Sequence, residues 1–219
     1  MKAIIFDMDG VLVDSMPYHA EAWSTVLKDI GIHIDKRMIY EIEGANSRKV
    51  IDTIFRQFGR TPTEEEIQDL GNKKSKIFEE IAQVKPFDGI QELLELVQSR
   101  YKLAVVSGSN QNTVHNIINT FFPNVFQVII DGETTEISKP SPEPYLVAVQ
   151  KLDIPKDQCL VIENAPLGIQ SAKSAGLRCI AIPTYLGKEY LKEADFIANN
   201  YKEIAEYIQG ELEKAEHCQ

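Results

Sequence analysis

Short apolar segments recur along the chain and alternate with longer stretches whose apolar residues stand three or four positions apart. A short apolar segment bounded by turn residues is typical of a strand buried on both faces. Spacing of three and four positions is typical of a helix with one buried face. Six strands are predicted in this way, the last from a weaker pattern, at residues 2–6, 103–107, 125–130, 160–163, 179–182 and 195–198.

The stretches between and after these strands predict helices at residues 91–100, 112–121, 144–152, 167–175 and 203–214. Strands that alternate with helices of this length form right-handed β-α-β units. Such units build a parallel sheet that helices cover on both faces. The pattern therefore predicts an α/β fold with a Rossmann-like parallel sheet.

Residues 15–84 interrupt this alternation, because the pattern there predicts helices and no strand. The last of these helices opens with Thr63 followed by three glutamates, the sequence of a capping box. The predicted helices lie at residues 16–30, 35–43, 47–58 and 64–81. We therefore expect an all-helical cap domain at residues 15–84, inserted into an α/β core of residues 1–14 and 85–219.

The composition of the 219 residues is that of an ordinary globular protein, with 43% hydrophobic and 26% charged residues. This balance excludes disordered and fibrous classes. The formal net charge is −10, and the sequence has no long basic segment. Such a chain is poorly suited to bind nucleic acids or anionic membranes, so we expect neither as a partner.

Cysteine usage and apolar content indicate the compartment. The three cysteines, Cys159, Cys179 and Cys218, lack the spacing of a metal site and are typical of free thiols in a reducing compartment. The first residues contain no secretory apolar segment, and no apolar run approaches the roughly 20 residues that cross a membrane. We therefore expect a cytoplasmic protein that acts as a monomer on a small molecule.

Polar side chains gather at the carboxyl ends of the predicted strands, where open parallel sheets bind their ligands. They comprise two carboxylates, a hydroxyl, a lysine and an acid–amide pair: Asp7, Asp9, Ser107, Lys139, Glu163 and Asn164. A carboxylate can attack phosphorus, and oxygen ligands hold Mg²⁺. A lysine and a hydroxyl bind phosphoryl oxygens. The set predicts phosphoryl transfer with Mg²⁺ as the cofactor.

Four segments resemble the ordered motifs of the haloacid dehalogenase superfamily: Asp7-Met-Asp-Gly-Val11, Ser107-Gly-Ser109, Lys139-Pro140 and Glu163-Asn164. The helical insert after the first motif is similar to that of the branch with a small helical cap. That branch includes β-phosphoglucomutase and many sugar-phosphate phosphatases. The resemblance covers nearly the whole chain, and its specificity comes from the order of the motifs together with the cap.

The resemblance implies that Asp7 is the nucleophile and becomes an aspartyl phosphate. Asp9 would protonate the leaving oxygen and later deprotonate the incoming one, and its backbone carbonyl would bind Mg²⁺. We expect a nearby carboxylate and partial burial to favour the proton that Asp9 needs. Gly10 would let the backbone approach the ligand closely. A plainer interpretation is that both aspartates only form a turn.

The second and third motifs are expected to bind the phosphoryl group. Ser107 would bind it together with the backbone N–H groups of Gly108 and Ser109, at the start of the next helix. Lys139 would neutralise Asp7 and the phosphate. The alternatives are that Ser107 caps a helix and that Lys139 is a solvated surface lysine.

The fourth motif departs from the family pattern, in which two acids are common. The amide oxygen of Asn164 can still bind Mg²⁺, but the site then has one negative charge fewer. Glu163 would bind the metal either directly or through water. Alternatively, the pair only caps the helix that follows.

Four cap residues are candidate substrate contacts. His19 and Lys74 lie on apolar helix stripes, so they either belong to the core or face the catalytic cleft. Arg48 opposes the dipole at a helix start, which a bound phosphate would relieve. Glu43 stands where mutases of the branch tend to have lysine. It is either a surface residue or faces the cleft, where it would repel a second phosphate or reach the metal.

The expected function is Mg²⁺-dependent hydrolysis of small phosphorylated metabolites, either sugar phosphates or pyrophosphate. The first alternative is a hexose-phosphate mutase of the β-phosphoglucomutase type, which must exclude water and rebind a bisphosphate. The second is a non-catalytic metal-binding or receiver-like module. A binding module needs no cap, whereas this chain devotes about a third of its residues to one.

Overall fold

The central element is a six-stranded parallel sheet with the order β3-β2-β1-β4-β5-β6. The computed structural model describes residues 1–217, with side chains as far as Glu211. The strands are β1 Ala3–Phe6, β2 Lys102–Val106, β3 Val128–Ile130, β4 Cys159–Glu163, β5 Arg178–Ala181 and β6 Phe196–Ile197. This confirms the predicted α/β fold with a Rossmann-like sheet.

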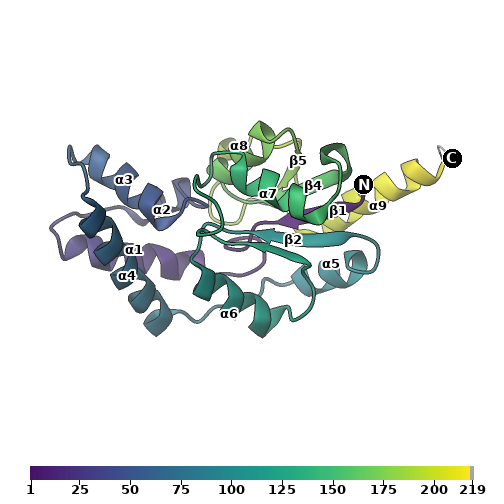
Figure 1. Cartoon of the computed structure of the whole chain (residues 1–219). Helices are drawn as coiled ribbons and strands as arrows, with labels where there is room; N and C mark the ends of the chain where they lie inside the picture. The colour runs from purple at the N-terminus through teal and green to yellow at the C-terminus, as the bar shows by residue number, and fades with distance from the viewer. Residues whose placement is uncertain (218–219) are drawn as a thin grey trace.

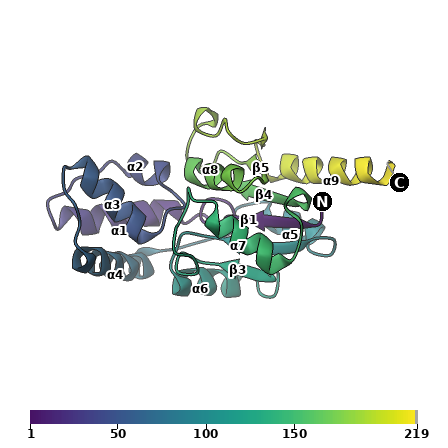
Figure 2. The ribbon, with the colours of Figure 1, turned by 45° about the horizontal axis from the view of Figure 1, so that its top comes forward.

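Helices cover both faces of the sheet (Figures 1 and 2). Helices α5, α6 and α9 lie on one face, and α7 and α8 lie on the other. The core helices are α5 Ile90–Val97, α6 Gln111–Phe121, α7 Glu143–Leu152, α8 Pro166–Ser174 and α9 Tyr201–His217, with short 3-10 turns at Lys156–Gln158 and Lys188–Tyr190.

The central strand β1 shows why the sequence forms a two-sided core. Its side chains alternate between the faces, so Ile4 and Phe6 join one apolar cluster and Ala3 and Ile5 join the other. All four are fully buried. Because β1 lies between β2 and β4, Asp7 emerges at the middle of the carboxyl edge.

Four helices between β1 and α5 form a separate bundle beyond that edge (Figure 1). They are α1 Met16–Lys28, α2 Lys36–Glu41, α3 Ser47–Gln57 and α4 Glu64–Ile81. They enclose an apolar cluster of their own that includes Trp23 and Phe55. The predicted capping box between Thr63 and Glu66 is present at the start of α4. We call this bundle the cap.

The two segments that join the cap to the sheet run side by side. Val13 pairs with Pro86 in an isolated bridge, and the backbone N–H of Asp14 donates to the carbonyl of Lys85 at 2.8 Å. This contact holds the cap above the carboxyl ends of the strands.

Strand β3 is shorter than its apolar pattern predicts. The side-chain Oε1 of Gln127 accepts a hydrogen bond from the Leu103 N–H at 2.6 Å, while the Gln127 N–H donates to the Leu103 carbonyl at 3.0 Å. A side chain therefore takes a position in the ladder that a backbone carbonyl would occupy. Regular pairing begins only at Val128.

No described helix combines the length and the apolar character that a membrane crossing requires. Cys159 and Cys179 are buried free thiols, whereas Cys218 lies outside the described residues.

Candidate active site

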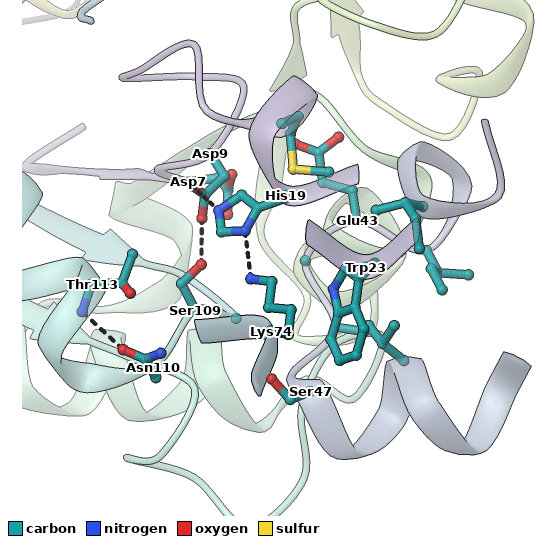
Figure 3. Close-up of a pocket in the computed structure, with 17 residues that line it drawn as sticks. Asp7, Asp9, His19, Trp23, Glu43, Ser47, Lys74, Ser109, Asn110 and Thr113 are labelled. Carbon is teal, nitrogen blue, oxygen red and sulfur yellow. Dashed lines mark hydrogen bonds and ion pairs between the residues drawn. The ribbon is translucent and has the colours of Figure 1, made fainter. Parts of the chain in front are cut away.

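A pocket lies between the carboxyl edge of the sheet and the cap (Figure 3). Both parts of the molecule line it, and most of the predicted site residues are there. Those that line the pocket directly are Asp7, Asp9, His19, Glu43, Lys74, Gly108 and Ser109. Ser107, Lys139, Glu163, Asn164 and Gly10 lie behind them, in contact with them.

Lys139 joins the two carboxylates at the centre of the sheet edge. Its ammonium lies 2.6 Å from Asp7 Oδ1, 2.7 Å from Glu163 Oε1 and 3.0 Å from the Val106 carbonyl, so all three of its protons are used. Lys139 is only 1% exposed, so it is not a surface lysine. Burial alone would lower its pKa, but the two carboxylates outweigh burial and raise the pKa above its ordinary value.

Asp7 keeps one oxygen outside this ion pair and lines the pocket. Burial raises the pKa of Asp7 well above its ordinary value, and the charge of Lys139 only partly offsets this. The charge of Lys139 favours the ionised form of Asp7, which is the form that can act as a nucleophile.

Glu163 is held by four donors. Its Oε1 accepts from Lys139 and from the Tyr145 hydroxyl at 2.8 Å, and its Oε2 accepts from the backbone N–H groups of Asn164 and Ala165 at 2.9 and 3.3 Å. A carboxylate offers about four acceptor positions, and these donors fill them. Glu163 is therefore held against Lys139, and its contact with a metal stays a prediction.

Helix α8 packs directly against the Glu163 carboxylate at Gly168. A Cβ atom on Gly168 would lie 1.7 Å from Glu163 Oε1. Alanine normally stabilises a helix interior by about 1 kcal/mol relative to glycine. Here we expect the opposite: Gly168→Ala lowers the free energy of unfolding by about 2 kcal/mol and lowers activity, because Glu163 must leave its position. Urea unfolding and phosphate release measure the two effects.

Gly71 in α4 provides the matched control for this prediction. A Cβ there would meet only ordinary contact, 3.6 Å from the Ser47 Cβ. Gly71→Ala should therefore be neutral or stabilising. A stabilised and fully active Gly168→Ala variant would show that Glu163 can move without consequence.

Asp9 accepts hydrogen bonds at both of its oxygens. Ser15 and His19 Nε2 donate to Oδ1 at 2.5 and 3.1 Å, while Ser107 and Ser109 donate to Oδ2 at 3.1 and 2.9 Å. Burial would raise the pKa of Asp9, but His19 and the hydroxyl groups outweigh it and hold the pKa well below its ordinary value. In this conformation Asp9 therefore accepts four hydrogen bonds, and its role as a proton donor stays a prediction.

Ser15 was not predicted as a site residue. It stands at the N-cap position of α1, where its hydroxyl would normally bond a backbone N–H of the first helical turn. No such bond forms, because the hydroxyl is turned to Asp9. Only the tertiary structure shows that this hydroxyl donates to Asp9 and does not accept from the helix backbone.

A hydrogen-bonded chain leads from the cap to Asp9 (Figure 3). Lys74 Nζ lies 2.6 Å from His19 Nδ1, and the His19 ring stacks on Phe78 with centroids 4.1 Å apart. An ammonium can only donate, so Nδ1 accepts and Nε2 carries the proton that faces Asp9. Burial and the charge of Lys74 lower the pKa of His19, and Asp9 partly offsets this. Both cap residues face the cleft.

The pKa of Lys74 predicts the pH above which activity should fall. Burial among aromatic rings lowers its pKa to about 8. Below that pH the ammonium donates to His19, and above it the charge is lost, so we expect kcat/KM to fall as pH rises through about 8. Lys74→Met should remove this inflection, whereas the exposed Lys76→Met should leave it unchanged. An inflection that persists in Lys74→Met would contradict the assignment.

Glu43 and Asn164 meet beside the catalytic carboxylates. Glu43 is only 4% exposed, so it is not a surface residue, and its Oε1 accepts from Asn164 Nδ2 at 2.9 Å. Burial raises the pKa of Glu43 well above its ordinary value; the bond from Asn164 opposes this rise, and the charge of Asp7 adds to it. The other amide atom, Asn164 Oδ1, is buried and has no hydrogen-bond partner within the described residues.

Gly10 makes room for this pair. Its φ is +87°, and a Cβ there would lie 2.0 Å from Asn164 Nδ2 and 2.7 Å from Glu43 Oε1. Any larger residue would displace them. Gly108 has a comparable role toward the cap, because its Cβ would lie 2.3 Å from the Gly44 carbonyl.

The residues present fit a divalent cation. Within the described part of the chain, no group of three histidine, cysteine or acidic side chains forms a metal site by itself. Mg²⁺, however, also takes amide and carbonyl oxygens and keeps several waters. The orphaned Asn164 Oδ1 is such an oxygen, and the buried groups of the site comprise four acids, Asp7, Asp9, Glu43 and Glu163, against the two lysines Lys74 and Lys139.

Arg48 is not brought into the pocket. Its guanidinium makes two bonds to Glu64 at 2.7 and 2.6 Å, and its side chain is 57% exposed. The anion near the start of α3 is therefore a carboxylate from the start of α4. A phosphate is not needed to relieve the dipole, and the geometry gives no support to Arg48 as a substrate contact.

Comparison with known proteins gives the family. The sequence profile described as haloacid dehalogenase-like hydrolase matches residues 4–182. The β-phosphoglucomutase of Bacillus subtilis is 32% identical over 190 residues, which cover 83% of each chain. The phosphorylated carbohydrates phosphatase of Thermotoga maritima is 30% identical over 183 residues, covering 82% of this chain and 84% of the relative. The solved β-phosphoglucomutase of Clostridium difficile superposes with a TM-score of 0.86 at 27% identity, covering 98% of each chain.

The matched region contains all four motifs, at residues 7–11, 107–109, 139–140 and 163–164. The resemblance seen in the sequence is thereby confirmed. Because these relatives are phosphatases and phosphomutases, the chain is an enzyme of that type. It belongs to the haloacid dehalogenase-like hydrolases, in the branch similar to β-phosphoglucomutase.

Proposed function

We propose that this enzyme is a Mg²⁺-dependent phosphatase of small phosphorylated metabolites that transfers the phosphoryl group first to Asp7 and then to water. The observation that carries the proposal is the buried Asp7–Lys139 pair, which lies at the carboxyl edge of the sheet and opens onto the pocket. Asp7 is the nucleophile, and Lys139 balances the charge that develops on the phosphoryl oxygens.

Phosphate binding and proton transfer fall to neighbouring groups. Ser107, Gly108 and Ser109 lie near the start of α6, and a bound phosphate would take over the Ser107 and Ser109 hydroxyls from Asp9 and the Ser109 N–H from Ser107 Oγ. The proton for the leaving oxygen is held on His19 Nε2, 3.1 Å from Asp9 Oδ1, with Lys74 behind it. As His19 Nε2 gives this proton to Asp9, the Lys74 ammonium gives one to His19 Nδ1, so the ring stays neutral, and Asp9 passes its proton to the leaving oxygen. Asp9 later takes a proton from water, and the reverse transfers restore His19 and Lys74.

The metal would be held by Asp7, the Asp9 carbonyl and the amide oxygen of Asn164, with Glu43 beside them. When bound, Mg²⁺ neutralises phosphoryl oxygens that would otherwise face an acidic pocket.

We expect Glu43→Gln to raise the Mg²⁺ concentration for half-maximal activity about tenfold, because it removes one buried negative charge without changing the size of the side chain. Asn164→Asp should leave that concentration unchanged or lower it. A Mg²⁺ titration of phosphate release measures both, and a large loss of affinity in Asn164→Asp would exclude Asn164 as a ligand.

The pocket indicates a small substrate. Its volume is about 50 Å³ with the cap in the observed position, below the roughly 300 Å³ of a pocket for a drug-sized ligand. Sugar phosphates or pyrophosphate are the substrates we propose, with cap movement admitting the larger ones. The Thermotoga maritima relative, named a phosphorylated carbohydrates phosphatase, supports the sugar phosphates.

A mutase is the second candidate, because the Bacillus subtilis relative is named a β-phosphoglucomutase. A mutase must hold a second phosphate in the pocket while it excludes water. Glu43 is a buried acid in that pocket. At an effective dielectric of about 20, a carboxylate about 5 Å from a phosphate costs roughly 3 kcal/mol per unit charge, about a hundredfold in affinity. Glu43 therefore favours the hydrolase.

The test is a panel of sugar phosphates, pyrophosphate and p-nitrophenyl phosphate, assayed for free phosphate and for isomer exchange. We expect phosphate release that EDTA stops and Mg²⁺ restores, with no interconversion of glucose 1-phosphate and glucose 6-phosphate. Efficient isomer exchange with little free phosphate would establish the mutase. Mg²⁺ binding without any turnover would indicate a binding module.

A further inference from the structure

Tyr145 contacts the catalytic ion pair from behind, and none of the four motifs includes it. It lies on α7 and is fully buried. Its hydroxyl donates to Glu163 Oε1 at 2.8 Å, and its ring centroid lies 5.0 Å from Lys139 Nζ. The residue therefore touches both Glu163 and Lys139, but it is absent from the pocket lining.

The Tyr145 hydroxyl affects how the Lys139 ammonium is shared between Asp7 and Glu163. This one ammonium serves two buried carboxylates at almost equal distances, 2.6 Å to Asp7 and 2.7 Å to Glu163. Without Tyr145, Lys139 would be the only side-chain donor to Glu163 among the described residues. The Glu163 carboxylate would then draw the ammonium away from Asp7, because an under-bonded buried carboxylate is costly.

We propose that Tyr145 is a positioning residue for phosphoryl transfer, which holds Glu163 so that Lys139 stays against Asp7. The inference rests on the proposed function, since it assigns the ion pair to the nucleophile. Tyr145 itself does not touch the substrate. Its effect reaches the reaction through three hydrogen bonds, from Tyr145 to Glu163, from Lys139 to Glu163 and from Lys139 to Asp7.

Tyr145→Phe isolates the hydroxyl. It keeps the ring, and with it the packing in the apolar cluster and the contact with the ammonium. Tyr201→Phe is the matched control, because it also deletes a buried tyrosine hydroxyl that makes a hydrogen bond. That hydroxyl donates to the Val11 carbonyl at 2.6 Å and has no link to Lys139 or Glu163 among the interactions described.

Kinetics separate positioning from packing. We expect Tyr145→Phe to lower kcat about tenfold, as the loss of a hydrogen bond to a charged group would, with KM within about twofold of the wild type. The loss should be the same for p-nitrophenyl phosphate and for an alkyl phosphate, because Lys139 acts at the nucleophile and not at the leaving oxygen. Tyr201→Phe should keep kcat within about twofold. A Tyr145→Phe variant with the kcat of the wild type would overturn the inference.

A second measurement needs no turnover. A buried ammonium with three acceptors exchanges its protons slowly, so Lys139 should give a resolved ¹⁵N–¹H signal in NMR spectra. We expect Tyr145→Phe to shift or broaden that signal and Tyr201→Phe to leave it in place. A wild type without phosphatase activity would refute the proposed function, while the signal would still decide whether Tyr145 positions Lys139. An unchanged signal in Tyr145→Phe would overturn the inference.

Discussion

Replacing Asp7 by asparagine is expected to lower kcat by at least about 10⁴-fold, a barrier increase of about 5.5 kcal/mol. An amide is a far weaker nucleophile than a carboxylate. Among the described residues Lys139 also pairs with Glu163, but Glu163 does not line the pocket, so no second carboxylate of the pocket is paired with Lys139. Asparagine has the size of aspartate and can still accept the hydrogen bond from Lys139. The variant should therefore bind substrate and keep its fold.

The stability of this variant has a predicted sign. The pKa of Asp7 is raised in the folded protein, so ionisation of Asp7 costs free energy of folding as the pH rises above its unfolded value. Asparagine has no such cost, so Asp7→Asn should unfold at an equal or higher urea concentration at pH 7. Asp14→Asn, at an exposed position after the same motif, is the control and should keep activity within about threefold. Asp7→Asn activity within about tenfold of wild type would exclude covalent transfer through this residue.

Removing Lys139 is expected to have the largest effect on stability. Lys139→Met keeps the length of the side chain but leaves Asp7 and Glu163, both nearly inaccessible, without their shared cation. Breaking a buried pair in this way typically costs about 3–5 kcal/mol. Activity should fall with it by at least about 10³-fold, because nothing then offsets the charge of the phosphoryl group.

The pH dependence and two controls test the cause of this loss. The pKa of Asp7 is raised by burial, and Asp7 loses the opposing charge of Lys139 in this variant, so the destabilisation should shrink as the pH falls and Asp7 becomes protonated. Adding Glu163→Gln to Lys139→Met should restore part of the free energy of unfolding but no activity. Lys173→Met breaks an ion pair of 2.6 Å to Asp195 whose side chains are more than a third exposed, and should cost less than about 1 kcal/mol. Equal losses for Lys173→Met and Lys139→Met would contradict the account.

The strands and the catalytic edge could be predicted from the sequence because both follow from local patterns. A buried apolar segment followed by acidic residues predicts a strand and the position of its carboxyl end. Asp7, Lys139 and Glu163 are far apart in the chain, but in the fold Lys139 Nζ lies 2.6 Å from Asp7 Oδ1 and 2.7 Å from Glu163 Oε1. The helical stripes likewise placed His19 and Lys74 on buried faces.

The remaining features depend on contacts between elements. The sequence does not reveal that the Ser15 hydroxyl leaves its own helix for Asp9, or that Glu64 of α4 pairs with Arg48 of α3. The role of Glu163 also depends on Tyr145 and on the close approach of α8, neither of which has a motif. Side-chain partners of this kind are decided by packing, which periodicity does not encode.

Trapping the phosphorylated enzyme tests the central claim most directly. The wild type, mixed with Mg²⁺ and p-nitrophenyl phosphate and quenched in acid within one turnover, is digested and examined by mass spectrometry. The account predicts one phosphoryl group on the peptide that contains Asp7, stable in acid and lost in base, and no such peptide from Asp7→Asn. Rapid release of phosphate by the wild type, with Asp7 unmodified at every quench time, would contradict it.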